Sequence, residues 1–166
     1  MSVDAEPALL LSWEDLAAVS RRLADALQAR GRPDIVVGVL RGGMVPAVLV
    51  AHELGVRALR GLEVTHTVAD GTDAAKTARP AVVNTASLGD VDGADVALVD
   101  DVAGSGDTLH TAAAQVRTAG AGRVRTLVCV VNEVNWARRG RTDPACVVDH
   151  VGMRCQGWVR FPWETR

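Results

Sequence analysis

Residues 96–109, VALVDDVAGSGDTL, place two adjacent carboxylates directly before a glycine-rich turn. Successive backbone N–H groups in such a turn form an anion-binding nest, and a following helix points its positive end at the same place. Ser105 and Thr108 add hydroxyl groups. The stretch lacks the Gly-Lys-Ser/Thr of a Walker A loop, and Leu109 occupies the third glycine position of a dinucleotide-binding motif. These residues therefore predict a phosphate-binding site of another kind.

Asp100 and Asp101 restrict which phosphate compound fits such a site. Carboxylates beside a bare phosphate would repel it by a few kcal/mol at intermediate dielectric. A ribose 5-phosphate unit offers hydroxyl groups that donate to the acids, and its C1 carries positive charge when a leaving group departs. Hydrogen bonds to charged groups contribute about 1.5–3 kcal/mol each. We therefore expect a phosphorylated ribose as the ligand.

The same stretch resembles the signature of the type I phosphoribosyltransferases, which bind 5-phosphoribosyl 1-pyrophosphate (PRPP). The resemblance implies that Asp100 and Asp101 hold the ribose hydroxyls. It also implies that Mg²⁺ arrives with PRPP and that Asp101 is the protein contact of the metal. The residues that would cradle the 5-phosphate are Ala103, Gly104, Ser105, Gly106, Asp107 and Thr108.

Residues 37–56, VGVLRGGMVPAVLVAHELGV, resemble the pyrophosphate loop of the xanthine/guanine/hypoxanthine branch of that family. The resemblance implies that Arg41, Gly42 and Gly43 hold the pyrophosphate, and that the peptide bond before Arg41 is cis. It assigns catalysis to Asp100, Asp101 and Arg41.

The chain ends in a third similar segment, GWVRFPWE at residues 157–164. Relatives of the branch pack the first Trp and the following aliphatic residue on the purine, and these positions are Trp158 and Val159 here. A flat base gains about 1–3 kcal/mol from such stacking. The alternative is a tail anchored in the core by its tryptophans, which Trp163 fits better than Trp158.

Two positions depart from the pattern of 6-oxopurine relatives. Gly104 stands where an Asp usually handles the N7 proton of the base. The third strand ends in Asn132 and Glu133, where a Lys often donates to O6. Asn132 either contacts a base other than guanine, xanthine or hypoxanthine, or it simply ends a strand.

Lys76 and Arg79 lie in a polar stretch at residues 69–80 that we interpret as a mobile loop. Relatives close such a loop over the pyrophosphate. The alternative is that both charges are solvated on a variable surface loop.

Strands and helices alternate along the rest of the chain. Residues 61–94 are predicted as a β-ribbon, with strands at 61–68 and 81–87. Ser12 and Asp15 form a capping box at the first helix, and Gly31 occupies its predicted C-cap position. Helices are predicted at 12–31, 44–55 and 107–120. Buried strands are predicted at 34–40, 95–99, 124–131 and 145–151.

This order predicts an α/β fold, with a parallel central sheet flanked by helices and with ligands at the carboxyl ends of the strands. We expect a single domain over residues 1–166, with a mobile loop in the 61–94 ribbon and a base-binding hood segment at 152–166.

The composition sets further bounds. The chain has 166 residues and a net charge of −2, which gives no general attraction to nucleic acid or to a membrane surface. No apolar run approaches the length of about 20 residues that spans a bilayer. Its three cysteines and four histidines show no metal-ligand spacing. These features favour a cytoplasmic protein, and the family resemblance favours a homodimer or homotetramer.

Together the three segments predict PRPP-dependent transfer of a phosphoribosyl group to a purine-type base, with xanthine, guanine or hypoxanthine as acceptor. Two alternatives stay open. One is transfer to an unusual nucleobase in secondary metabolism, and the other is a non-catalytic regulator that senses PRPP.

Overall fold

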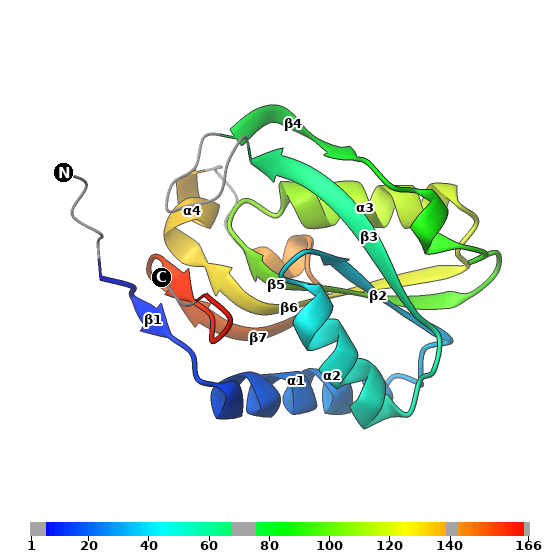
Figure 1. Cartoon of the computed structure of the whole chain (residues 1–166), viewed down its shortest axis with the longest axis horizontal. Helices are drawn as coiled ribbons and strands as arrows, with labels where there is room; N and C mark the ends of the chain where they lie inside the picture. The colour runs from blue at the N-terminus through cyan, green and yellow to red at the C-terminus, as the bar shows by residue number, and fades with distance from the viewer. Residues whose placement is uncertain (1–5, 68–75, 139–142, 165–166) are drawn as a thin grey trace.

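The computed structural model describes residues 6–67, 76–138 and 143–164 (Figure 1). Its strands are β1 Leu9–Leu10, β2 Ile35–Leu40, β3 Leu59–Thr67, β4 Lys76–Val82, β5 Asp95–Ala103, β6 Arg123–Asn132, β7 His150–Cys155 and β8 Val159–Arg160. Its α-helices are α1 Trp13–Gln28, α2 Met44–Leu54, α3 Asp107–Thr118 and α4 Glu133–Arg138, and two short 3-10 helices cover Ala86–Leu88 and Pro144–Cys146.

The central sheet has six strands in the order β4-β3-β2-β5-β6-β7. All neighbouring strands in it are parallel except β3 and β4, which form an antiparallel ribbon at one edge. A separate two-stranded parallel sheet joins β1 to β8, and thus the beginning of the described chain to its end. The predicted α/β class with a mostly parallel central sheet is confirmed.

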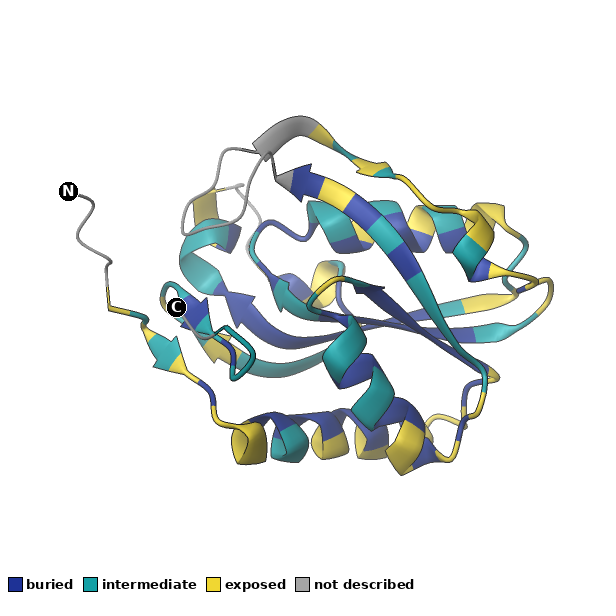
Figure 2. Ribbon diagram, viewed as in Figure 1, coloured by how far each residue is buried: buried dark blue, intermediate teal, exposed yellow. Residues whose placement is uncertain are grey.

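Helices cover both faces of the sheet. The apolar residues of α1 and α2 pack with Val36, Ala97 and Leu127 on one face, and those of α3 pack with Val37 and Leu98 on the other. Figure 2 shows the buried strands between these helix layers. Because both faces are covered, β2, β5 and β6 are nearly continuous apolar runs.

The first helix begins as predicted and ends earlier. The Ser12 side chain accepts a hydrogen bond from the Asp15 N–H, and Asp15 accepts one from the Ser12 N–H, which completes the capping box. Its C-cap is Ala29 rather than Gly31. Gly31 follows with φ of 98°, so its left-handed conformation shapes the next turn instead.

The predicted strand at 145–151 is wrong. Pro144–Cys146 forms a 3-10 turn that the Asp143 side chain caps by accepting the Ala145 N–H over 2.9 Å. Asp149 then accepts the Thr126 N–H over 2.8 Å, so the strand at the edge of the sheet begins only at His150.

Two further boundaries differ from prediction. The second ribbon strand covers Lys76–Val82 rather than 81–87, so part of the predicted loop at 69–80 is strand. Residues 68–75 of that loop lie outside the described residues. β5 extends through both acids to Ala103, because it pairs with β6 along this whole length.

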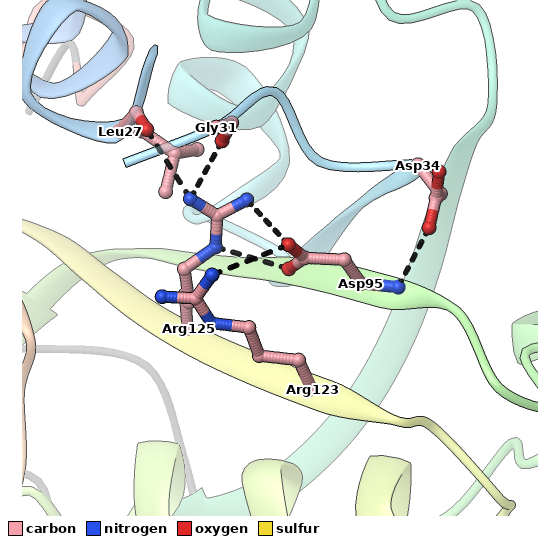
Figure 3. Close-up of polar contacts among 6 residues, drawn as sticks. All are labelled: Leu27, Gly31, Asp34, Asp95, Arg123 and Arg125. Carbon is pink, nitrogen blue, oxygen red and sulfur yellow. Dashed lines mark hydrogen bonds and ion pairs between the residues drawn. The ribbon is translucent and has the colours of Figure 1, made fainter. Parts of the chain in front are cut away.

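Arg125 joins helix α1 to the amino ends of the central strands (Figure 3). Its side chain is 4% exposed and binds Asp95 through Nε at 3.0 Å and Nη2 at 2.9 Å. Nη1 donates to the carbonyl oxygens of Leu27 and Gly31, at 3.2 and 2.8 Å. Arg125 therefore satisfies carbonyl groups at and just beyond the end of a helix that carries no basic residue in its last turn.

Replacing Arg125 by Ala should lower the free energy of unfolding by about 3 kcal/mol, because the partly buried Asp95 carboxylate loses its two short hydrogen bonds and the Gly31 carbonyl loses its Arg125 donor. Urea unfolding followed by circular dichroism measures this loss. The control is Arg123→Ala, since Arg123 contacts the same Asp95 at 3.7 Å from a side chain that is 50% exposed. That control should cost less than about 1 kcal/mol, and equal losses in the two variants would contradict the assignment.

Candidate functional site

The site lies at the carboxyl ends of the central parallel strands, where β2, β5 and β6 each lead into a turn or a helix. In parallel α/β sheets this edge is where ligands bind, because loops and helix N-termini meet there. The sequence motifs fall at these strand ends.

The turn at residues 104–106 leads from β5 into α3 and has a tightly defined shape. Gly106 adopts a left-handed backbone with φ of 78°, a conformation that favours glycine. The Ser105 hydroxyl donates to Asp107 Oδ2 over 3.0 Å and accepts from the Asp107 N–H over 3.3 Å. Ser105 thereby shapes the turn, and the N-terminus of the 12-residue helix α3 supplies N–H groups for an anion.

The Arg-Gly-Gly turn after β2 lies directly against the two acids of β5. A Cβ atom at Gly42 would lie 1.8 Å from Asp101 Oδ2, and one at Gly43 would lie 2.8 Å from the Asp100 Cα atom. Both distances are below the 3.0 Å that real Cβ contacts respect. At Gly43 the close atoms are backbone, so only glycine fits there, whereas a Cβ at Gly42 would displace the Asp101 carboxylate. The fold thus brings together two motifs that are far apart in the sequence.

Arg41 begins this turn and is exposed, whereas Gly43, which directly precedes α2, is buried. The peptide bond between Leu40 and Arg41 is cis, as the family resemblance implied. Gly43 precedes α2 as its N-cap residue, so a second helix N-terminus lies beside the acids.

The two acids sit in an unfavourable place for negative charge. Asp100 is 7% exposed, and burial raises its pKa well above the usual 3.8, helped by the neighbouring Asp101 charge. Burial also raises the pKa of Asp101, against the lowering effect of the Val102 N–H that donates to it over 2.7 Å. The carboxylate of Glu164 raises it further. A cation or hydroxyl donors beside these acids would therefore stabilise their charged forms.

The end of β6 forms a polar cluster with the end of β7. Asn132 is 6% exposed, and its side-chain oxygen accepts the Asn135 N–H over 3.2 Å at the start of α4. Glu133 accepts hydrogen bonds from Arg154, at 3.4 Å, and from Gln156. Asn132 thus caps the start of α4, and its contact with a base stays a prediction.

The C-terminal segment is tied to the N-terminal one. The Trp158 carbonyl accepts the N–H groups of Ala8 and Leu9, at 2.8 and 3.2 Å, while its side chain stays partly exposed. Val159 is 5% exposed and packs in the cluster between α1 and the sheet. Its side chain therefore packs in the core, and its contact with a base stays a prediction.

Trp163 anchors the tail. Its ring stacks on Phe161 with centroids 4.7 Å apart and an interplanar angle of 11°, and it contacts Trp13 at 6.2 Å. Glu164 closes this turn by accepting the Phe161 N–H over 2.9 Å. This stack matches the anchoring role considered for Trp163 and holds Glu164 near Asp101.

Lys76 and Arg79 lie on strand β4 rather than in a loop. Arg79 is exposed. The segment that would carry a lid movement, residues 68–75, lies outside the described residues, so a lid role stays a prediction.

Sequence reasoning assigned no role in the site to four residues near these strand ends, namely Arg154, Gln156, Glu164 and His66. Glu133 meets Arg154 and Gln156 only because β6 and β7 are neighbours, and Glu164 affects Asp101 only through the folded tail. His66 on β3 lies 3.5 Å from Thr108, measured from Nδ1 to Oγ1. Each pairing joins residues from separate elements, so no local pattern signals it.

Comparisons with known proteins agree with this geometry. Residues 8–166 match the model of the phosphoribosyl transferase domain family. The chain is 30% identical to the xanthine-guanine phosphoribosyltransferase of Ruegeria sp. (strain TM1040) over 160 residues, which cover 93% of this chain and 84% of the relative. The corresponding enzyme of Roseobacter denitrificans is 31% identical over 161 residues, with the same coverage.

Solved structures share the fold. The purine phosphoribosyltransferase of Pyrococcus horikoshii Ot3 superposes with a TM-score of 0.74 at 27% identity, over 95% of this chain and 94% of that one. The xanthine-guanine-hypoxanthine phosphoribosyltransferase of Helicobacter pylori superposes with a TM-score of 0.72 at 18% identity and the same coverage.

The raised pKa of Asp100 generates a stability prediction. A carboxyl whose pKa is higher in the folded than in the unfolded chain loses stabilisation as the pH rises from the unfolded pKa through the folded one. Asn at position 100 resembles the protonated acid, and it keeps an oxygen for the Asp101 N–H, which Asp100 accepts over 3.0 Å. Asp100→Asn should therefore unfold at higher urea concentration than wild type, by more at pH 7.5 than at pH 5.

These measurements are made without substrates or metal ions, and Asp25→Asn on the exposed face of α1 is the control. A gain of about 1 kcal/mol or more is expected at pH 7.5 for Asp100→Asn, and none for the control. Loss of stability in Asp100→Asn at both pH values would show that the charged acid is favoured in the fold.

Proposed function

The chain belongs to the phosphoribosyl transferase domain family, and from this premise we propose that it transfers a 5-phosphoribosyl group from PRPP to a purine-type base. Pyrophosphate and a nucleoside 5-monophosphate are the products. The observation that carries the proposal is the contact of Gly42 with Asp101, which joins the anion-binding turn after β2 to the acids and the phosphate turn after β5.

The donor would lie across these turns. Asp100 and Asp101 would accept hydrogen bonds from the ribose 2- and 3-hydroxyls, and residues 103–108 would hold the 5-phosphate through backbone N–H groups at the start of α3. Arg41 and the N–H groups of Gly42 and Gly43 would hold the pyrophosphate. The two phosphate-binding turns meet at the acids, so they would place C1 of the ribose between them.

In the reaction, a ring nitrogen of the base forms a bond to C1 while the bond from C1 to the pyrophosphate oxygen breaks and its electron pair leaves with pyrophosphate. The base loses a ring proton, which would pass to water because Gly104 has no side chain to accept it. Positive charge develops on the ribose ring, so the carboxylates of Asp100 and Asp101 would stabilise it electrostatically. Arg41 would stabilise the negative charge that grows on the leaving group. Catalysis by this chain would consist mainly of positioning and charge stabilisation.

The residues at the site fit a magnesium ion. Mg²⁺ prefers hard oxygen ligands and is usually held by one or two carboxylates together with substrate phosphates. Asp101 provides a partly exposed carboxylate at the strand end, and its raised pKa marks negative charge that is short of compensation. Mg²⁺ would supply charge neutralisation of PRPP at this carboxylate. Asp101 would hold the ion, in concert with the oxygens of PRPP.

The base would bind on the side of Trp158, a partly exposed residue three positions after the end of β7. Val159 and Asn132 would contribute less directly, because Val159 packs in the core and the Asn132 oxygen caps α4. The names of the relatives favour xanthine and guanine as acceptors. Gly104 supplies no side chain for the N7 proton, which keeps transfer to an unusual base as the second candidate.

A PRPP-sensing regulator without activity is the other alternative, and the complete Arg-Gly-Gly turn favours an enzyme over it. A homodimer or homotetramer and a cytoplasmic location stay predictions. Among the described residues, none of the helices is long and apolar enough to cross a membrane.

The first experiment measures pyrophosphate release from PRPP and Mg²⁺ with xanthine, guanine, hypoxanthine, adenine and uracil in separate reactions. We expect turnover with at least one 6-oxopurine and none when EDTA removes the metal. Tight PRPP binding without turnover of any base would instead support the regulator. Turnover confined to a base outside the three 6-oxopurines would support the second candidate.

The second experiment tests the acid at the strand end. Asp101→Asn removes the charge that would hold Mg²⁺ and the ribose hydroxyls, and it should lower kcat/KM for PRPP at least about tenfold. Asp25→Asn, on the exposed face of α1, should match wild type in the same assay. Wild-type rates in Asp101→Asn would mean that the donor site lies elsewhere.

A further inference from the structure

His66 connects the ribbon at the edge of the sheet to the phosphate turn. It lies near the end of β3, is 8% exposed, and places Nδ1 3.5 Å from the Thr108 hydroxyl oxygen. Thr108 is the second residue of α3, directly after Asp107. A nearly buried imidazole therefore borders the helix N-terminus that would hold the 5-phosphate.

The strand is irregular where His66 occurs. Thr65 pairs with Ala81 and Thr67 pairs with Lys76. The pairing therefore moves two residues along β3 but five residues along β4. Such irregularities redirect side chains and are frequent beside active sites. Here the irregularity flanks His66, whose side chain reaches the start of α3 through its contact with Thr108.

The direction of the hydrogen bond between His66 and Thr108 decides what the hydroxyl can do. A hydroxyl group has one proton to donate and lone pairs to accept. If Thr108 donates to Nδ1, its proton points at the imidazole and cannot serve a phosphate oxygen. If Nδ1–H donates to Thr108 Oγ1, the hydroxyl proton is released for a phosphate oxygen at the helix N-terminus.

We propose that His66 is a positioning residue for the phosphate group, with Nδ1–H donating to Thr108 Oγ1 so that the Thr108 hydroxyl donates to the 5-phosphate of the substrate. This inference rests on the proposed function, because it assumes that the helix N-terminus binds the 5-phosphate of ribose. No bond forms or breaks in this role, since His66 only orients a hydroxyl. The phosphate is held alike in the substrate and in the transition state, so the effect falls on KM for PRPP rather than on kcat.

The test compares four variants for binding of ribose 5-phosphate by calorimetry and for PRPP kinetics. His66→Phe keeps an aromatic ring and removes the donor, whereas His66→Asn keeps an N–H close to the position of Nδ1. Thr108→Val removes the hydroxyl that is oriented, and the fourth variant combines His66→Phe with Thr108→Val. His52→Asn on the exposed surface of α2 is the control.

We expect His66→Phe and Thr108→Val each to weaken ribose 5-phosphate binding and to raise KM for PRPP by about 5- to 20-fold, with kcat changed less than about threefold. His66→Asn should bind within about threefold of wild type. The combined variant should be no weaker than Thr108→Val alone, because both changes remove one contact. Thermal unfolding checks that all variants are folded.

Three results would overturn the inference: wild-type binding by His66→Phe, equal weakening of His66→Asn and His66→Phe, or additive losses in the combined variant. Failure of the proposed function looks different. In that case the wild-type chain itself turns over no base, whereas the comparison of ribose 5-phosphate binding among the variants still decides the role of His66. If the wild-type chain binds no ribose 5-phosphate at all, both the phosphate site and this role of His66 are wrong.

Discussion

The close approach of the turn after β2 to the end of β5 is the constraint on which the site depends. It requires β2 and β5 to be neighbours in one register, from Ile35 opposite Val96 to Gly38 opposite Val99. Gly38 has a second role, since a Cβ there would lie 2.9 Å from Ala47, so α2 packs very close to the strand. A slip of this register by one residue would separate Gly42 from Asp101 and move neighbouring side chains that share a face of the sheet to opposite faces.

Charged groups are paired with partners of opposite charge at the amino ends of the central strands, whereas like charges lie close together at the carboxyl ends. At the amino ends, Arg125 lies between a carboxylate and two carbonyl groups, so the buried charge has complementary partners. At the carboxyl ends, Asp100, Asp101 and Glu164 bring negative charges together, and burial raises the pKa of the two strand acids. Functional sites commonly lower the stability of a fold in this way. The hydrogen bonds of Arg125 at the amino ends stabilise the same strands.

The parts of the structure that follow local rules were predictable from the sequence. The capping box at Ser12, the apolar central strands and the glycine turns each depend on neighbouring residues, and the structure contains all of them. The strand expected at 145–151 was wrong because a side-chain contact from Asp149 to Thr126, on another strand, decides where β7 begins. The burial of Val159 likewise depends on the pairing of β8 with β1, which joins residues from both ends of the chain.

The distinction between local sequence patterns and tertiary pairing also separates the two halves of the proposed site, one for the donor PRPP and one for the acceptor base. The proposed donor half would use backbone N–H groups and glycines that allow close approach, so a few consecutive residues encode it and local sequence patterns predict it. The proposed acceptor half depends on Trp158, whose carbonyl accepts N–H groups of Ala8 and Leu9 near the other end of the described chain. Tertiary pairing therefore positions this residue, which lies outside both proposed phosphate-binding turns. Substitutions around it would alter the choice of base and leave the two turns intact.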